Sequence, residues 1–165
     1  MRSSQVLVIG IGNDYAGDDA VGRIVARRMT ALSGGNIRVI EESGEGAALI
    51  ELWKGAEVAI VIDAVSSGGA PGTIHRFDTA VQPIPAKFLH HSTHAFSLAE
   101  AIGLARALNQ LPDKLVVYGI EGKNFESGAD LSMEADAAVD EVIGKIREEA
   151  EYWNRERSRR SNRLR

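Results

Sequence analysis

The chain has 165 residues, of which 44% are hydrophobic and 25% charged, and it carries a formal net charge of −4 with no cysteine. This profile is that of one globular domain that buries a core without a disulfide or structural metal, and it excludes a thiol nucleophile and a cysteine-ligated metal centre. The first apolar run begins too close to Met1 for a signal peptide, and no apolar run approaches the roughly 18–20 residues of a membrane span, so we expect a cytoplasmic protein without membrane contact.

Apolar runs and helical periods alternate along the chain. Short strands rich in valine and isoleucine are separated by segments with apolar residues at helical spacing. Strands of this kind are buried on both faces, which favours a parallel sheet with helices on both sides. The predicted elements are strand 5–11, helix 19–32, strand 37–41, short helix 46–53, strand 57–64, short strand 73–78, helix 93–108, strand 115–121 and a last helix 132–153.

The fold class predicted from this order is α/β, a single three-layer α/β/α domain. Its sheet has five twisted strands that are mostly parallel, with helices on both faces. The short strand 73–78 is expected to pair antiparallel at one edge. His75 lies on this edge strand and is expected to be exposed.

The end of the chain differs in composition from the rest. Residues 151–165 contain six arginines and two glutamates, a net charge of +4, so residues 1–150 carry −8. A basic arm of this kind sometimes contacts nucleic acid, but these arginines form no platform interleaved with aromatic residues and follow a helix that is ending. We therefore expect an α/β domain over residues 1–150 and a basic helix end or tail over residues 151–165, with no nucleic-acid partner.

Polar residues stand where the predicted strands end. The first strand runs through the glycine turn 10–13 towards Asp19, the third ends in Asp63, and the helix after the edge strand begins near His94. Ligands bind at the carboxyl ends of the strands in open parallel sheets, so these side chains are expected to converge. Two carboxylates and an imidazole are a ligand set for a divalent transition metal with open positions. The second and fifth strands also end in acids, at Glu41, Glu42 and Glu121.

Each of these residues also has a structural interpretation. Asp18 and Asp19, at a helix start, fit a cap or a charge that compensates the helix dipole as well as they fit a site. His94, taken alone, is typical of a surface histidine beside a Ser/Thr cap. Asp63 directly follows the apolar run 58–62 and has no structural reason to be there other than a capping turn, which favours a function for it.

Motifs of other protein classes are incomplete in this chain. Residues 10–15 lack the third glycine of a dinucleotide fingerprint, no Walker lysine follows, and no Gly-x-Ser-x-Gly elbow exists. Glu41 and Glu42 stand about where a ribose-binding acid would lie, so a nucleotide-binding domain or small-molecule hydrolase on the same sheet is an alternative. Such a protein would be stabilised by nucleotides and not by nickel.

Four motifs of the chain resemble those of the hydrogenase maturation proteases, endopeptidases that trim the C-terminus of the large subunit of nickel-iron hydrogenases. The resemblance runs from Val6 to about residue 150. Each motif alone is weak evidence, and the four in this order are fairly specific. They comprise Gly10-Ile11-Gly12-Asn13 with residues 18–22, then residues 42–46, 61–65 and 92–98.

The family resemblance implies which residues form the site. Family members carry an acidic residue at the position of Asp19, an aspartate at that of Asp63 and a histidine at that of His94, and this chain matches at all three. In the family these residues bind the nickel of the substrate, and the enzyme has no permanent metal cofactor. The nickel-loaded large-subunit precursor supplies the ion as a recognition element and loses a short C-terminal peptide. The resemblance therefore implies that these three residues are both catalytic and nickel-binding in a monomeric peptidase whose partner is that precursor.

The residues are compatible with hydrolysis by an activated water. Without a cysteine, a serine elbow or a His-Glu-x-x-His zinc helix, a covalent nucleophile is disfavoured, and either nickel or a carboxylate would activate the water. A carboxylate in that role needs a pKa nearer neutrality, and Asp18 beside Asp19 is a neighbour that would raise it. The alternative function is a nickel-sensing chaperone that binds the loaded precursor through the same three residues without cutting it.

Overall fold

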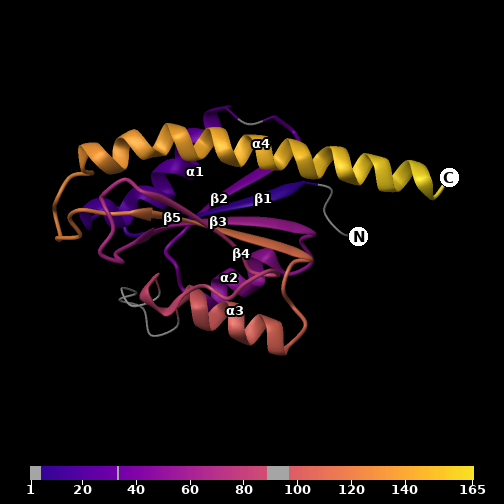
Figure 1. The fold of residues 1–165 in the computed structure, drawn as a ribbon, viewed down its shortest axis with the longest axis horizontal. Helices are drawn as coiled ribbons and strands as arrows, with labels where there is room; N and C mark the ends of the chain where they lie inside the picture. The colour runs from indigo at the N-terminus through magenta and orange to yellow at the C-terminus, as the bar shows by residue number, and fades with distance from the viewer. Residues whose placement is uncertain (1–4, 33, 89–96) are drawn as a thin grey trace.

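The computed structural model describes residues 5–32, 34–88 and 97–165. Five strands in this part of the chain form one sheet, and their order across it is β2-β1-β3-β5-β4 (Figure 1). All neighbouring pairs are parallel except β4 and β5, which are antiparallel, so the predicted mixed sheet with an antiparallel edge strand is confirmed. The strands are β1 (Val6–Ile11), β2 (Ile37–Glu42), β3 (Val58–Val65), β4 (Ile74–Asp78) and β5 (Lys114–Glu121).

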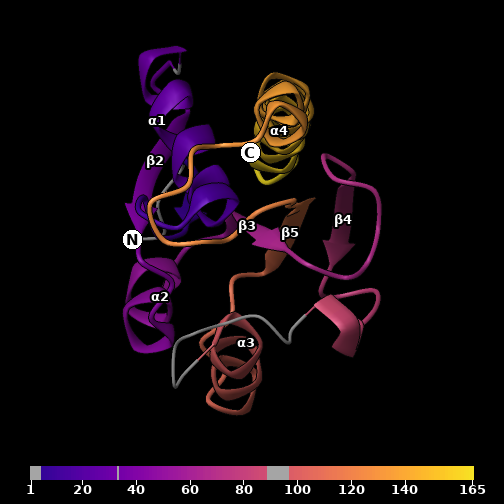
Figure 2. The ribbon, with the colours of Figure 1, turned by 90° about the vertical axis from the view of Figure 1, so that its left-hand side faces the viewer.

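Helices cover both faces of this sheet, as predicted. Helices α1 and α4 lie together on one face, and α2 and α3 lie together on the other (Figure 2). Two short 3₁₀ turns, η1 and η2, complete the described elements. The bounds are η1 (Gly17–Ala20), α1 (Val21–Leu32), α2 (Gly46–Trp53), η2 (Ala86–Phe88), α3 (Leu98–Ala107) and α4 (Met133–Arg163).

The apolar core is divided into two layers by the sheet. Along β3, Ile60 and Ile62 pack with residues of α1 and α4, whereas Val61 packs with residues of α2 and α3. Side chains alternate between the faces of a strand, so Asp63, two positions after Val61, belongs to the face covered by α2 and α3. The alternation of side chains along β3 therefore places Asp63 on the side of the sheet that α2 and α3 cover.

Two helix starts differ from the predicted ones by more than one residue. Residues 17–20 form a separate 3₁₀ turn before α1, where a continuous helix from residue 19 was expected. Helix α3 begins at Leu98, with Ser97 as its N-cap in a capping box with Glu100, and the predicted start at residues 93–96 lies outside the described residues.

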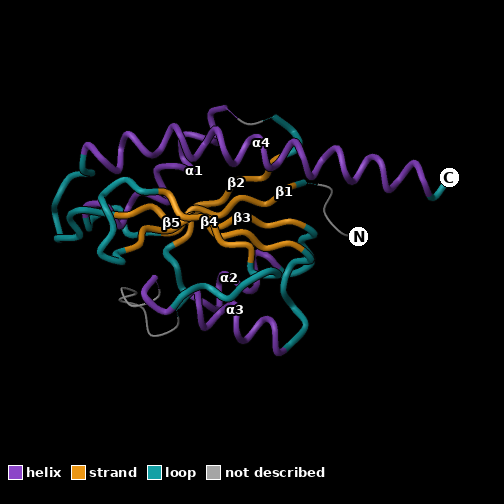
Figure 3. The backbone as a smooth tube through the Cα atoms, viewed as in Figure 1, coloured by secondary structure: helices purple, strands orange, loops and turns teal. Residues whose placement is uncertain are grey.

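The last helix is longer than predicted. Helix α4 continues to Arg163, beyond the predicted end at residue 153, and extends past the ends of the strands (Figure 3). Its last buried residue is Ala150, so the extension is maintained by helix-forming charged residues, including the ion pair of Glu156 with Arg159 at 2.9 Å. Among the described helices, none is long and apolar enough to cross a membrane.

Candidate active site

A cavity of about 60 Å³ lies at the carboxyl ends of β1 and β3, on the face covered by α2 and α3. Asp19, from turn η1, and Asp63, from β3, both line it. Both side chains are partly buried. The structure therefore brings together two of the three site residues predicted from the sequence, from segments more than 40 positions apart.

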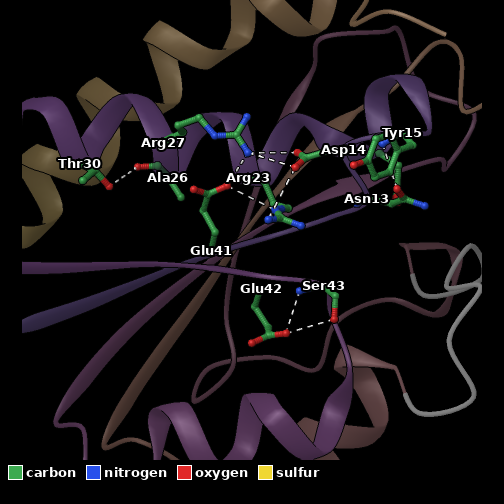
Figure 4. Close-up of polar contacts among 11 residues, drawn as sticks. Asn13, Asp14, Tyr15, Arg23, Ala26, Arg27, Thr30, Glu41, Glu42 and Ser43 are labelled. Carbon is green, nitrogen blue, oxygen red and sulfur yellow. Dashed lines mark hydrogen bonds and ion pairs between the residues drawn. The ribbon is translucent and has the colours of Figure 1, made fainter. Parts of the chain in front are cut away.

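The turn after β1 places Asp19 against the end of that strand. A Cβ atom on Gly12 would lie 2.0 Å from the backbone oxygen of Asp19, so only glycine permits this approach. The backbone N–H of Asn13 donates to Oδ2 of Asp19 at 3.1 Å. The Asn13 side chain accepts from the backbone N–H of Tyr15 at 2.9 Å, which closes a local turn visible in Figure 4. The glycine and asparagine of the turn thus hold the carboxylate at the cavity.

Asp63 has a strongly perturbed ionisation. Removal from water raises its pKa, and the nearby charge of Asp19 raises it further, to about 8, although the backbone N–H of Ala64 acts in the opposite direction. The two carboxylates therefore repel each other, and ionising both of them costs free energy. Such a pair favours the arrival of a cation, and strongly shifted carboxylates in a cavity are characteristic of functional sites.

Asp18 has a different role from the one expected. It is fully buried and faces the loop between β5 and α4, where its carboxylate accepts backbone N–H bonds from Lys123 at 2.6 Å, Asn124 at 3.2 Å and Ser132 at 2.7 Å. Burial alone would raise the pKa of Asp18, but these bonds outweigh it and lower the pKa below its usual value. The neighbour that raises a carboxylate pKa in the cavity is thus Asp19 acting on Asp63, and Asp18 binds the adjacent loop.

The acids that end β2 do not line the cavity, and both have partners. Glu41 accepts from Arg27 at 2.6 Å and from Arg23 at 3.3 Å, and Asp14 pairs with the same two arginines (Figure 4). Glu42 accepts from the backbone N–H of Ser43 at 2.8 Å. These contacts give Glu41 and Glu42 a structural role, which explains why acids stand at the end of β2.

The cavity has an apolar wall that the sequence analysis missed. It is built mainly by β4, η2 and the start of α3, and no local pattern in the sequence shows that these segments meet. The wall joins the two carboxylates to a surface suited to aliphatic and peptide groups. Its apolar residues include Val65, Phe77, Ile84, Phe88, Leu98 and Val117.

His94, the third predicted site residue, lies outside the described residues. Within the described ranges, no three histidine, cysteine, aspartate or glutamate side chains cluster in a way that could hold a metal ion. Ser97, three positions after His94, lines the cavity.

Comparison with known proteins gives the family of this chain. Residues 22–149 match the family model described as hydrogenase maturation protease. The chain belongs to the hydrogenase maturation protease family. The match includes Asp63 and begins after Asp19.

Individual members of the family align over most of the chain. A hydrogenase expression/formation protein, HupD of Rhodobacter capsulatus, is 28% identical over 92% of this chain and 74% of its own length. A putative hydrogenase maturation protease of Methanocaldococcus jannaschii is 27% identical over 89% of this chain and 99% of its own length. The solved structure of the hydrogenase maturating endopeptidase HybD from E. coli superposes with a TM-score of 0.74 at 23% identity, covering 86% of this chain and 89% of that one. This likeness confirms the α/β fold.

Proposed function

We propose that the chain is an endopeptidase that removes a short C-terminal peptide from the nickel-loaded large-subunit precursor of a nickel-iron hydrogenase. The observation that carries this proposal is the meeting of Asp19 and Asp63 in one cavity, in a chain of the hydrogenase maturation protease family. The fold alone would support many activities, so the argument depends on these two residues and on the family.

The nickel of the precursor is part of the substrate in this proposal. Carboxylate oxygens and an imidazole nitrogen bind nickel, and Asp19, Asp63 and His94 would supply three such ligands. Three protein ligands leave positions for groups that the precursor already provides to the ion. A divalent cation between Asp19 and Asp63 also relieves the repulsion that raises the pKa of Asp63. A precursor without nickel lacks this attraction and would be rejected.

Hydrolysis follows from positioning within this cavity. The shared ion fixes the precursor, and its scissile peptide bond then lies beside the carboxylates, where a water activated by the ion or by a carboxylate attacks the carbonyl carbon. The leaving amine takes a proton and the short peptide departs. The apolar wall formed with Phe77 and Phe88 excludes bulk water from one side of the reacting group.

The intact mass of a nickel-loaded precursor, measured before and after incubation with this protein, tests the proposal. We expect loss of a C-terminal peptide from the loaded precursor and no change in the nickel-free one. Asp19→Ala, Asp63→Ala and His94→Ala should each reduce cleavage by at least about a hundredfold. Asp14→Ala is the matched control, because Asp14 lies in the same loop as Asp19 but pairs with arginines outside the cavity.

Two other outcomes would contradict the proposal. Nickel-dependent binding without any change in mass would support the chaperone alternative. Cleavage that is indifferent to nickel and to all three substitutions would place the chemistry elsewhere in the chain.

A further inference from the structure

A second polar group faces the cavity side of the sheet, in line with Asp63. In the strand register, Asp63 of β3 pairs with Gly119 of β5, and Gly119 pairs with His75 of β4. Neighbouring strands are about 4.8 Å apart, so the Cα atoms of Asp63 and His75 are about 10 Å apart across the sheet. The three residues lie in one row, and the two side chains flank a glycine.

Gly119, in the middle of this row, has no side chain of its own and is covered by the methyl groups of Val65. It lines the cavity, and a Cβ atom there would lie 2.9 Å from Cγ1 of Val65, which is too close. The absence of a side chain at Gly119 thus lets Val65, which also lines the cavity, pack onto the middle of the row. The result is a strip of sheet about two strand spacings wide with a polar group at each side.

His75 is held in place by a buried carboxylate. Its Nε2 lies 3.1 Å from Oε1 of Glu121, a side chain that is only 1% exposed. The Glu121 carboxylate also accepts hydrogen bonds from Ser67, one from its hydroxyl and one, at 3.2 Å, from the backbone N–H of Ser67. A buried carboxylate needs such donors, and in return it orients the imidazole ring.

The ring of His75 is also packed against the cavity wall. Its centroid lies 4.6 Å from that of Phe88, which lines the cavity. The side chain is 24% exposed, so His75 is half-buried where the sequence analysis expected an exposed residue. The reason for the difference is the combined contact with Phe88 and Glu121, both distant in sequence. His75 is thus an oriented, solvent-accessible polar group beside the proposed active site.

We propose that His75 binds the main chain of the substrate's C-terminal segment beside Phe88, at the wall of the cavity, and that Glu121 positions His75 for this contact. The inference rests on the proposed function. In the neutral tautomer whose Nε2–H donates a hydrogen bond to Glu121, Nδ1 carries no hydrogen. Nδ1 is then a hydrogen-bond acceptor, the correct partner for a peptide N–H. An extended segment then has the nickel ligand Asp63 on one side and His75 on the other.

Kinetics with the full chain and the nickel-loaded precursor test this assignment. His75→Phe keeps an aromatic ring against Phe88 and removes both ring nitrogens. We expect it to raise KM, and the dissociation constant of the uncleaved complex, about tenfold with kcat within about twofold. His75→Gln, which retains hydrogen-bonding groups, should recover part of the loss. Arg38→Ala, an exposed position on strand β2 at the opposite edge, is the control.

Further variants separate a binding role from a structural one. Glu121→Gln should weaken binding in the same direction as His75→Phe, and the double variant should add little to either because the two residues act together. Urea unfolding of each variant reports any loss of stability. The preference for nickel-loaded over nickel-free precursor should be kept by His75→Phe and lost by Asp63→Ala.

The outcomes distinguish this inference from the proposed function. Cleavage by the wild type with unchanged KM and affinity in both His75 variants would overturn the role of His75 and leave the protease intact. Binding without cleavage that is weakened by His75→Phe would retain His75 as a substrate contact and refute the protease. Absence of any binding to the loaded precursor would overturn both.

Discussion

Two carboxylates at the same edge of the sheet have opposite environments. Asp18 is fully buried and accepts three backbone N–H bonds, which lower its pKa. Asp63 is partly buried and faces a second carboxylate, and its pKa rises to about 8. The difference shows that burial alone does not identify a functional acid. The donors around a carboxylate decide whether its charge supports the fold or opposes it.

The largest loss of stability is expected from substitution of Asp18. Asp18→Ala leaves three backbone N–H groups of the loop between β5 and α4 without their acceptor, and should reduce the free energy of unfolding by about 3 kcal/mol. Asp18→Asn keeps one acceptor oxygen and should lose less. Urea unfolding near pH 7 measures both changes. A loss below about 0.5 kcal/mol for the alanine variant would contradict a structural role for this carboxylate.

The pH dependence of this contribution has a defined sign. The pKa of Asp18 is lowered in the folded chain, so its stabilisation is present above the ordinary value of 3.8 and is lost as the pH falls through the folded value. The difference between wild type and Asp18→Ala should therefore shrink in acid. A difference that stays constant down to about pH 2 would show that the bonds do not depend on the charge.

Asp63 should show the opposite behaviour in metal-free protein. Its pKa is about 8 in the folded chain against an ordinary 3.8, so the folded state retains a proton that the unfolded chain releases. Stability therefore falls as the pH rises from about 4 to 8, and Asp63→Asn removes this loss. We expect the variant to be similar to wild type at pH 4 and more stable than it by about 5 kcal/mol at pH 9, because each pH unit between the two pKa values contributes about 1.4 kcal/mol.

Urea unfolding with a chelator present, at several pH values, measures this crossover. Asp140→Asn, a substitution of a side chain on α4 that is 85% exposed, serves as the control and should show no such dependence. A stability difference for Asp63→Asn that does not change with pH would refute the raised pKa. The gain also makes a functional point, because this residue would then be kept at a cost to the fold.

The fold could be predicted from the sequence, and so could the functional interpretation of one of these two acids, Asp63. The strands are short, apolar and bounded by turns, so their positions and the parallel sheet followed from local pattern. Asp63 stood out because it directly follows the apolar run 58–62, which was expected to be buried. Asp19 followed from the glycine turn after β1, although a capping role was equally compatible with the sequence.

The partners of the buried acids were not accessible in this way. Asp18 binds backbone groups more than 100 positions away, and the contact of Glu121 with His75 spans 46 positions. Backbone donors carry no sequence signature, and the pairing of β4 with β5 determines the second contact. The length of α4 was not predicted because the helix leaves the core after Trp153, so apolar periodicity no longer indicates a helix there.

The smallest effect is expected from the exposed ion pairs beside the same turn. Arg27 lies 2.6 Å from Glu41 and 3.2 Å from Asp14, but its side chain is 52% exposed, and Arg23 still contacts both acids when Arg27 is removed. Arg27→Ala should therefore cost about 0.5 kcal/mol in dilute buffer, and less in about 1 M salt, where such charges are screened. Urea unfolding at the two salt concentrations measures this. A loss as large as that of Asp18→Ala would mean that the surface ion pairs, and not the buried backbone bonds of Asp18, hold the loop that carries Asp19.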